Sequence, residues 1–291
     1  MKIVRTVDEM KRTVAVYRDQ KKQIGFVPTM GFLHEGHLSL MKEANKENDI
    51  VAASIFINPL QFGPNEDYER YPRDETADAR AAENAGVDVL FIPDPTEIYP
   101  APMQIQLGIK GRADVLCGRS RPGHFEGVLT VLTKLFHITS PDKVYFGLKD
   151  AQQVAVVDAL INDLNFPIEL VGLPTVRESD GLAKSSRNVN LSEHERHEAI
   201  WLYKGLAFGQ KLIHDGEQTP NEIVQNVTEL LNQNLSAGKI DYIELLSYPS
   251  LEPVSSVNQR VILAGAVYFA KARLIDNLIF DQDGEVINRV N

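Results

Sequence analysis

The chain has 291 residues, of which 43% are hydrophobic and 24% charged, and its formal net charge is −10. This length suits one large or two moderate domains, and the acidic balance argues against nonspecific nucleic-acid binding, which depends on Lys and Arg. No apolar run approaches a membrane span, and the first residues lack the apolar core of a secretion signal. The single cysteine, Cys117, excludes an internal disulfide framework. We therefore expect a cytoplasmic protein without membrane or nucleic-acid partners.

Apolar runs alternate with helical patterns through the first part of the chain. Strands are expected at residues 24–29, 50–58, 87–93, 144–147 and 168–173, and helices at 37–45, 76–85, 125–138 and 152–165. Several of these strands are apolar almost throughout, which is typical of strands buried on both faces of a parallel sheet. The order predicts an α/β fold with a Rossmann-like, doubly wound parallel sheet over residues 1–175. The ligand is expected at the carboxyl ends of the strands.

The pattern changes near Pro174. A polar turn at 177–181 precedes two long helical stretches at 192–215 and 220–237. Shorter strand patterns follow at 240–246, 261–269 and 274–279. We therefore predict a second, smaller α+β domain over residues 176–291.

The most informative motif lies between the first predicted strand and the helix after it. Residues 28–37 read Pro-Thr-Met-Gly-Phe-Leu-His-Glu-Gly-His. His34 and His37 share one face of a first helical turn, where free backbone N–H groups and the helix dipole attract anions. Gly31 and Gly36 would let a phosphate approach the main chain. The motif predicts a nucleoside triphosphate site whose α-phosphate is attacked, although His-x-Gly-His also arises by chance in turns.

Two amide side chains follow the next predicted strand. Pro59 cannot continue a central strand, so Asn58 and Gln61 are expected to project from a loop at its carboxyl end. Amides both donate and accept hydrogen bonds, which suits a small substrate with hydroxyls and a carboxylate. An Asn-Pro turn with a solvated Gln is the alternative.

Residues 144–153 repeat the strand, turn and helix layout. Gly147 permits close backbone approach, and Lys149 supplies a point charge for phosphate. Asp150 can cap the helix or accept hydrogen bonds from a ribose, and Gln153 lies on the first helical turn.

A further cationic segment lies where the two predicted domains meet. Lys184, Ser185, Ser186 and Arg187 place two hydroxyls between two cations, which predicts a mobile clamp on phosphate; a solvated surface loop is the alternative. Arg73, Arg119, Arg121 and His124 are further polar candidates to which the sequence assigns no role.

Together these segments resemble the pantoate–β-alanine ligase family, which belongs to the nucleotidyltransferases with a His-x-Gly-His motif. The resemblance extends from about residue 1 to the C-terminus and is most specific at residues 28–37, 58–62, 146–153 and 185–188. Two positions depart from the family pattern. Lys184 stands where the family usually has Met, and Leu148 stands where it usually has an acidic residue.

The resemblance implies an ATP-dependent ligase that joins (R)-pantoate to β-alanine through a pantoyl-adenylate and releases AMP and diphosphate. Mg²⁺ should accompany ATP, and a homodimer is implied. His34, His37 and Lys149 would be the catalytic residues, with His37 the expected proton donor. Gln61 and Gln153 would bind pantoate, with Asn58 beside them, and Gln61 would also contact β-alanine.

The resemblance also implies a set of ATP-binding residues. They are Met30, Gly31, Phe32, Leu33, His34, Glu35, Gly36, His37, Gly147, Leu148, Lys149, Asp150, Val176, Lys184, Ser185, Ser186 and Arg187. No metal ligand is assigned, and a carboxylate among Asp74, Glu75 and Asp78 is a guess.

Three other functions remain open from the sequence alone. A nucleotidyltransferase acting on a phosphorylated acceptor would need more cations than Asn58, Gln61 and Gln153 provide. A non-catalytic nucleotide sensor would form no AMP in response to a carboxylic acid. An aminoacyl-transfer enzyme is disfavoured by the acidic charge and by the lack of an evident tRNA-binding module.

Overall fold

The computed structural model describes residues 1–63 and 68–291. Within these residues, a parallel sheet of six strands has the order β1-β4-β3-β2-β5-β6. The strands are β1 (Lys2–Val4), β2 (Ile24–Thr29), β3 (Ile50–Ile55), β4 (Val89–Phe91), β5 (Lys143–Gly147) and β6 (Glu169–Leu173). After β2 the chain adds β3 and then β4 on one side, and after β5 it adds β6 on the other side. The carboxyl ends of β2 and β5 therefore flank the topological switch point, where such sheets bind ligands.

Helices cover both faces of this sheet. Buried side chains of α1 (Val7–Asp19), α6 (His124–Thr139) and α7 (Ala151–Asp163) form one core cluster with the strands. Those of α2 (Glu35–Glu47) and α3 (Glu75–Asn84) form another. Shorter helical elements connect these layers: α4 (Pro95–Ile98), α5 (Leu116–Arg119) and the 3-10 turns η1 (Pro59–Gln61), η2 (Leu148–Asp150) and η3 (Ser186–Asn190). Both faces are thus buried, which explains the continuously apolar strands.

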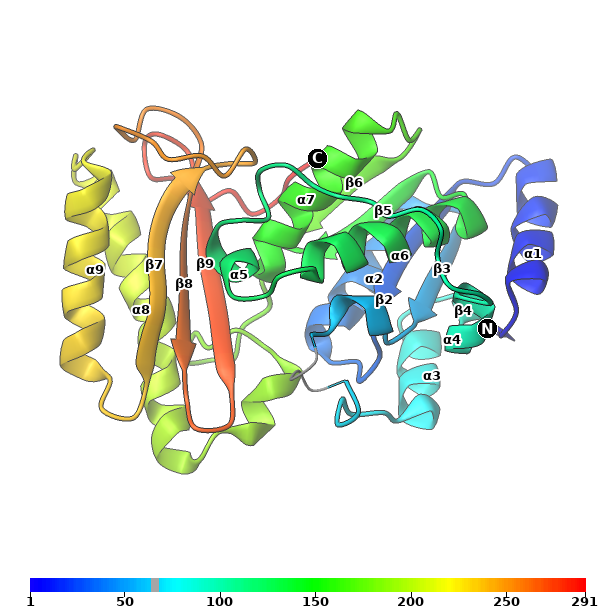
Figure 1. Cartoon of the computed structure of the whole chain (residues 1–291), viewed down its shortest axis with the longest axis horizontal. Helices are drawn as coiled ribbons and strands as arrows, with labels where there is room; N and C mark the ends of the chain where they lie inside the picture. The colour runs from blue at the N-terminus through cyan, green and yellow to red at the C-terminus, as the bar shows by residue number, and fades with distance from the viewer. Residues whose placement is uncertain (64–67) are drawn as a thin grey trace.

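The second part of the chain is built on an antiparallel sheet. In the described residues this sheet has three strands in the order β7-β8-β9, namely β7 (Lys239–Ser247), β8 (Val261–Tyr268) and β9 (Arg273–Phe280). The helices α8 (Glu193–His214) and α9 (Pro220–Asn234) pack on one face, as Figure 1 shows. The other face contributes Ile262, Ala264 and Ile279 to the same core as α6 and α7. The antiparallel sheet therefore lies between its own helices and the first part of the molecule.

The predicted α/β class is confirmed, together with the parallel sheet and the smaller α+β part. β1, α1, α4 and α5 are not among the predicted elements, and β3 ends at Ile55 rather than at residue 58 because the η1 turn begins at Pro59. A domain boundary near residue 176 stays a prediction. Contacts cross it at the chain end, where Val290 and Gly172 exchange backbone hydrogen bonds of 2.7 and 3.0 Å.

Across the part of the chain that the structure describes, no helix combines the length and the apolar character that crossing a bilayer requires.

Candidate active site

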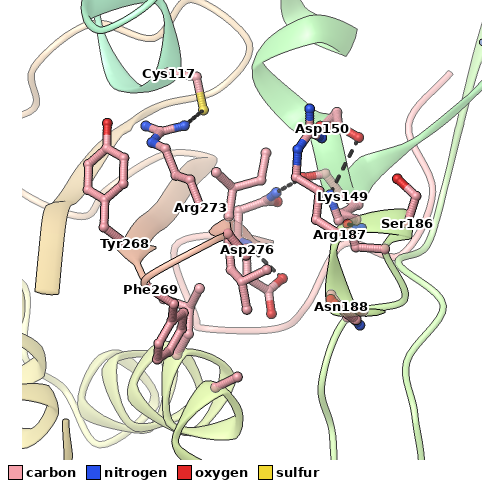
Figure 2. A pocket seen from close by; sticks show the side chains of 18 of the residues that line it. Cys117, Lys149, Asp150, Ser186, Arg187, Asn188, Tyr268, Phe269, Arg273 and Asp276 are labelled. Carbon is pink, nitrogen blue, oxygen red and sulfur yellow. Dashed lines mark hydrogen bonds and ion pairs between the residues drawn. The ribbon is translucent and has the colours of Figure 1, made fainter. Parts of the chain in front are cut away.

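A cavity of about 240 Å³ lies at the carboxyl ends of β2 and β5. It adjoins a wider cleft of about 910 Å³ between the first part of the molecule and the antiparallel sheet. Lys149, Asp150, Gln153 and residues 185–187 line both spaces. In Figure 2, Lys149, Asp150 and Arg187 lie on one side of the wider cleft, and Tyr268 and Arg273 lie on the other. The motifs predicted separately from the sequence therefore meet at one place.

The two histidines at the start of α2 cap the helix reciprocally. His34 is the N-cap residue, and its Nδ1 accepts a hydrogen bond from the Gly36 N–H at 3.1 Å. The His34 N–H donates to Nδ1 of His37 at 3.3 Å, and the ring centroids are 4.2 Å apart. Because both Nδ1 atoms accept, a neutral ring carries its proton on Nε2. The pair thus offers two Nε2–H donors at a helix N-terminus.

Both rings are neutral at neutral pH. The pKa of His37 is lowered to about 3, mainly by burial and to a smaller extent by the neighbouring His34. Burial also lowers the pKa of His34, and the positive charge of Lys149 acts in the same direction. A neutral ring still donates a hydrogen bond, but a group with so low a pKa holds no transferable proton at neutral pH.

Gly36 is required by this arrangement. A Cβ at Gly36 would lie 2.9 Å from Cε1 of His34 and would displace the ring from its cap. Gly36, Met30, His34 and His37 line the smaller cavity, whereas Phe32 lines the wider cleft.

The rest of this turn is held by α3 rather than exposed to a ligand. The backbone N–H groups of Phe32 and Leu33 donate to the two carboxylate oxygens of Asp78 at 2.8 and 2.7 Å. A Cβ at Gly31 would lie 2.8 Å from Cγ2 of Ile55, so Gly31 is a packing position with a positive φ of 85°. Gly31, Leu33 and Glu35 are absent from the lining of both spaces.

None of the three carboxylates considered for a metal faces the cavity. The Asp78 carboxylate is buried against the Phe32 turn. Asp74 caps α3 by accepting from the Ala77 N–H at 3.0 Å, and Glu75 forms an ion pair with Arg5. Among residues 1–63 and 68–291, no group of three or more His, Cys, Asp or Glu side chains could hold a metal ion.

Gln61 lines the cavity, and Asn58 supports it from behind. Nε2 of Gln61 lies 3.2 Å from Sδ of Met30, and its Oε1 accepts from Nδ2 of Asn58 at 3.2 Å. Asn58 is only 1% exposed and does not line the cavity. Its amide also donates to the Gly127 carbonyl, and its Oδ1 accepts from the Tyr99 hydroxyl. Asn58 therefore lies behind Gln61 in this structure, and its contact with a substrate stays a prediction.

The turn after β5 contributes open space beside its backbone and two charged side chains. A Cβ on Gly147 would meet no atom of the described chain within 4 Å, so the backbone here borders open space. Nζ of Lys149 lies 3.8 Å from Oδ2 of Asp150. Asp150 occupies the N-cap position of α7 without a side-chain capping bond, so its carboxylate stays available at the cavity. Leu148 is buried in the core and lines neither space.

The segment 184–187 completes the rim of the cavity. The Lys184 N–H donates to the Val176 carbonyl at 2.9 Å, and its Nζ lies 3.7 Å from Oε2 of Glu35. Ser185 caps η3 by accepting from the Arg187 N–H. Val176, Lys184, Ser185, Ser186 and Arg187 all line the smaller cavity. The structure thus brings this segment opposite the histidine turn, as a clamp requires.

Sequence reasoning missed the apolar wall and the support behind Gln61. The wall is made by side chains of α6 that line the cavity, namely Val128, Val131, Leu132 and Leu135. His124 Nδ1–H donates to the Gln61 carbonyl at 2.8 Å, and His124 Nε2 accepts from Arg121 at 3.1 Å. The pattern at 125–138 predicted a helix, but nothing in it indicated which residues face a ligand.

Comparison with known proteins places the chain in a family. The family model described as Pantoate-beta-alanine ligase matches residues 2–279. The chain belongs to the pantoate–β-alanine ligase family. A pantothenate synthetase from Bacillus velezensis is 57% identical over 283 residues, covering 97% of this chain and 98% of that protein. A pantothenate synthetase from Bacillus subtilis is 54% identical over 281 residues, with 97% and 98% coverage.

Solved structures of the family have the same fold. A pantothenate synthetase from Thermus thermophilus superimposes with a TM-score of 0.90 at 43% identity, covering 96% of this chain and 99% of that chain. A pantoate–β-alanine ligase from Francisella tularensis, complexed with β-γ ATP and β-alanine, gives a TM-score of 0.75 at 36% identity, with 97% and 98% coverage. Membership of this family identifies the chain as a ligase.

Proposed function

We propose that the chain condenses (R)-pantoate with β-alanine, consuming ATP and releasing AMP and diphosphate through a pantoyl-adenylate. The observation that carries this proposal is the convergence on one cavity of two kinds of group. The first kind is groups suited to phosphate, namely His34, His37, Lys149 and the 184–187 segment. The second kind is the amides of Gln61 and Gln153 with the apolar wall of α6. The family match and the ATP and β-alanine bound to the Francisella tularensis enzyme support the same reaction.

ATP is placed by charge and by open space. The Nε2–H donors of His34 and His37 and the ammonium of Lys149 would contact the phosphates. The open space beside Gly147 admits the nucleoside, and the Val176 backbone would border the adenine.

Pantoate would bind where the polar and apolar groups of the cavity match its own. Its hydroxyls and carboxylate match the donors and acceptors of Gln61 and Gln153, which line the cavity. Its two methyl groups match the apolar wall formed by α6. β-Alanine would enter beside Gln61 after the first step.

The residues act mainly by positioning the reactants and stabilising charge. The pantoate carboxylate attacks the α-phosphorus and diphosphate leaves, a step that needs no proton from the protein. His34 and His37 would stabilise the charge that develops on the phosphate oxygens as neutral hydrogen-bond donors. This replaces the expected role of His37 as a proton donor, because burial keeps its pKa near 3. In the second step the neutral amine of β-alanine attacks the acyl carbon, the bond to the phosphate oxygen breaks so that AMP leaves, and the amide nitrogen releases a proton to solvent.

Mg²⁺ remains part of the proposal. When bound, it would neutralise charge on the polyphosphate. Mg²⁺ is commonly held by one or two carboxylates together with substrate phosphates, and Asp150 lines both the cavity and the cleft. A homodimer and a cytoplasmic location stay predictions.

The test follows ATP–diphosphate exchange and AMP release while each substrate is omitted in turn. Exchange should require pantoate and not β-alanine, because it reports the adenylation step alone. Sustained AMP release should require both acids. Exchange that depends on β-alanine, or AMP release without pantoate, would contradict the proposed reaction. Turnover with a phosphorylated acceptor in place of pantoate would favour the alternative nucleotidyltransferase.

A further inference from the structure

Two consecutive residues of the antiparallel sheet reach the two phosphate-binding segments of the first part. Asp276 and Asn277 lie side by side on β9, are 4% and 7% exposed, and line the wider cleft. Consecutive strand residues point to opposite faces of a sheet. One strand can therefore hold two different segments at once.

Asn277 holds the turn that carries Lys149. Its Nδ2 donates to the carbonyl of Leu148 and to the carbonyl of Lys149, each at 2.9 Å. Both acceptors belong to η2, the 3-10 turn between β5 and α7. An amide with two donated bonds to adjacent carbonyls fixes the orientation of that turn, and with it the start of the Lys149 side chain.

Asp276 holds the base of the 184–187 segment through Arg177. The Arg177 guanidinium donates to both carboxylate oxygens of Asp276 at 2.6 and 3.0 Å and to the Gly181 carbonyl at 3.1 Å. It also stacks on the Tyr203 ring, with Cζ 3.9 Å from the ring centroid. Arg177 pairs with Ala183 across an isolated antiparallel bridge, so the ion pair with Asp276 also holds the chain immediately before the 184–187 segment.

We propose that Asp276 and Asn277 are positioning residues for adenylation, which set the separation between Lys149 and the 184–187 segment. In Figure 2, Asp276 lies in the wall of the cleft between Arg273 and the turn bearing Lys149. The proposal rests on the proposed phosphate contacts of Lys149 and Arg187. It gives the antiparallel sheet a part in the chemistry, although no side chain of β9 needs to touch a reacting atom.

The main experiment is a double-mutant cycle on pantoyl-adenylate formation in single turnovers of the full chain. Asn277→Asp removes both donated bonds and should slow adenylation by about 10²-fold, which is the effect of a misplaced catalytic group. In the Lys149→Gln background the same change should slow adenylation by less than about twofold. The ammonium that Asn277 positions is already absent there, so its misplacement has no further effect. Equal losses in both backgrounds, or a near-normal rate for Asn277→Asp, would overturn the proposal.

A matched control separates positioning from stability. Gln210→Glu makes the same amide-to-carboxylate change at a side chain of α8 that donates to the Gly284 carbonyl at 2.9 Å, outside the residues lining the cleft. Its rate should stay within about twofold of the parent. If Asn277→Asp does not fold by circular dichroism, Asn277→Ala takes its place in the same cycle.

Asp276 is tested with Arg187 in the same way. Asp276→Asn should slow adenylation in the parent and have little effect in the Arg187→Ala background, whereas additive losses would remove Asp276 from the proposal. A normal rate for Lys149→Gln alone would instead contradict the proposed role of Lys149, so the two failures are distinguishable.

Discussion

His34 serves both the start of a helix and the proposed phosphate site. Its Nδ1 caps α2, and its Nε2–H is left for a ligand. Substituting Asn separates these roles, because Asn is a good N-cap but its shorter side chain carries no donor to the position of the ring Nε2. We expect His34→Asn to keep the thermal stability of the parent and to slow adenylation by about 10²-fold. His34→Ala should lose the cap as well, at about 1 kcal/mol of stability.

Rapid-quench rates and thermal melts of these two His34 variants provide the measurement. A normal adenylation rate for His34→Asn would show that the ring only caps the helix.

The low pKa of His37 predicts a pH-dependent stability. An unfolded His titrates near 6.5, whereas burial keeps the folded ring neutral to about pH 3. As the pH falls below 6.5, the unfolded state binds a proton that the folded state does not, so the free energy of unfolding decreases. His37→Gln retains an acceptor for the capping box and does not titrate. This variant should lose less stability than the parent between about pH 7 and about pH 5.5 in urea unfolding.

Carboxylates contribute little to the change in stability over this pH range, because their pKa values lie below about 5. Equal losses of stability in the parent and in His37→Gln would contradict the neutral buried ring.

Gly147 offers a test of where the nucleotide lies. Its φ of −84° suits any residue, and a Cβ would enter open space. Gly147→Ala should therefore fold normally but raise the KM for ATP about tenfold or more, because the methyl group would occupy part of the nucleotide's space. Gly108→Ala is the matched control, since its Cβ would also meet nothing within 4 Å of the described chain and it lines neither space. The KM for ATP of both variants is measured by steady-state kinetics. An unchanged KM in Gly147→Ala would show that the nucleotide does not bind beside Gly147.

At the scale of single residues, the sequence predicted the location of residues that are placed by local structure. Gly147 ends β5, and His34 and His37 lie at the start of the helix that follows β2, so strand–turn–helix patterns indicate where such residues lie. The contacts of Asn58 and Asp78 were not predicted, because their partners are distant in sequence: Tyr99 and Gly127 for Asn58, and the Phe32 turn for Asp78. Asn277 gave no signal at all, because an Asn in an apolar strand does not reveal which carbonyls it will meet.

At the scale of elements, the 184–187 segment carries a prediction of its own. Arg187→Ala should slow adenylation strongly, because Lys184 cannot reproduce a planar guanidinium. Lys184→Met, which restores the residue usual in the family, should have a mild effect, because Ser185, Ser186 and Arg187 remain. Rapid-quench measurement of pantoyl-adenylate compares the two. Equal, near-normal rates in both variants would show that the 184–187 segment does not bind the phosphates and that only residues of the first part of the chain do.

Long, strongly patterned elements were predicted well, and short or weakly patterned ones were not. β2 matches its predicted bounds, and α8 agrees to within a residue at each end. The predicted elements do not include α1, which buries few side chains, among them Met10 and Val14. Its start was nonetheless encoded, since Thr6 accepts from the Glu9 N–H as an N-cap residue does. β1 has three residues, of which only Ile3 and Val4 are apolar, whereas the equally short β4 lies within the longer predicted strand at 87–93.

At the scale of the whole molecule, the shared core predicts cooperative unfolding. Ile279 of β9 is 2% exposed and belongs to the cluster that contains α6 and α7. Ile279→Ala should cost about 2–5 kcal/mol and lower the midpoint of a single transition, because both parts of the molecule lose the same contacts. Differential scanning calorimetry provides the measurement. Two separated transitions in the variant would show that the two parts unfold independently.

The layout of the whole molecule was the most predictable level, because alternating β and α patterns indicate a parallel sheet. The packing of the antiparallel sheet on α6 and α7 was not predictable. It depends on which face of β8 and β9 meets another layer, and both faces of those strands are apolar, as Ile262 and Leu263 illustrate.

The bridge between Gly172 and Val290 has a consequence for self-association. β6 is an edge strand, and exposed edges of sheets are templates for pairing with other chains. The returning C-terminal segment occupies part of that edge, and Arg289 fastens it to Glu43 and Glu47 of α2. A bulky tag fused after Asn291 would disturb this segment, whereas the start of the chain lies at β1, the opposite edge strand of the sheet. Preparations tagged at the N-terminus should therefore aggregate less.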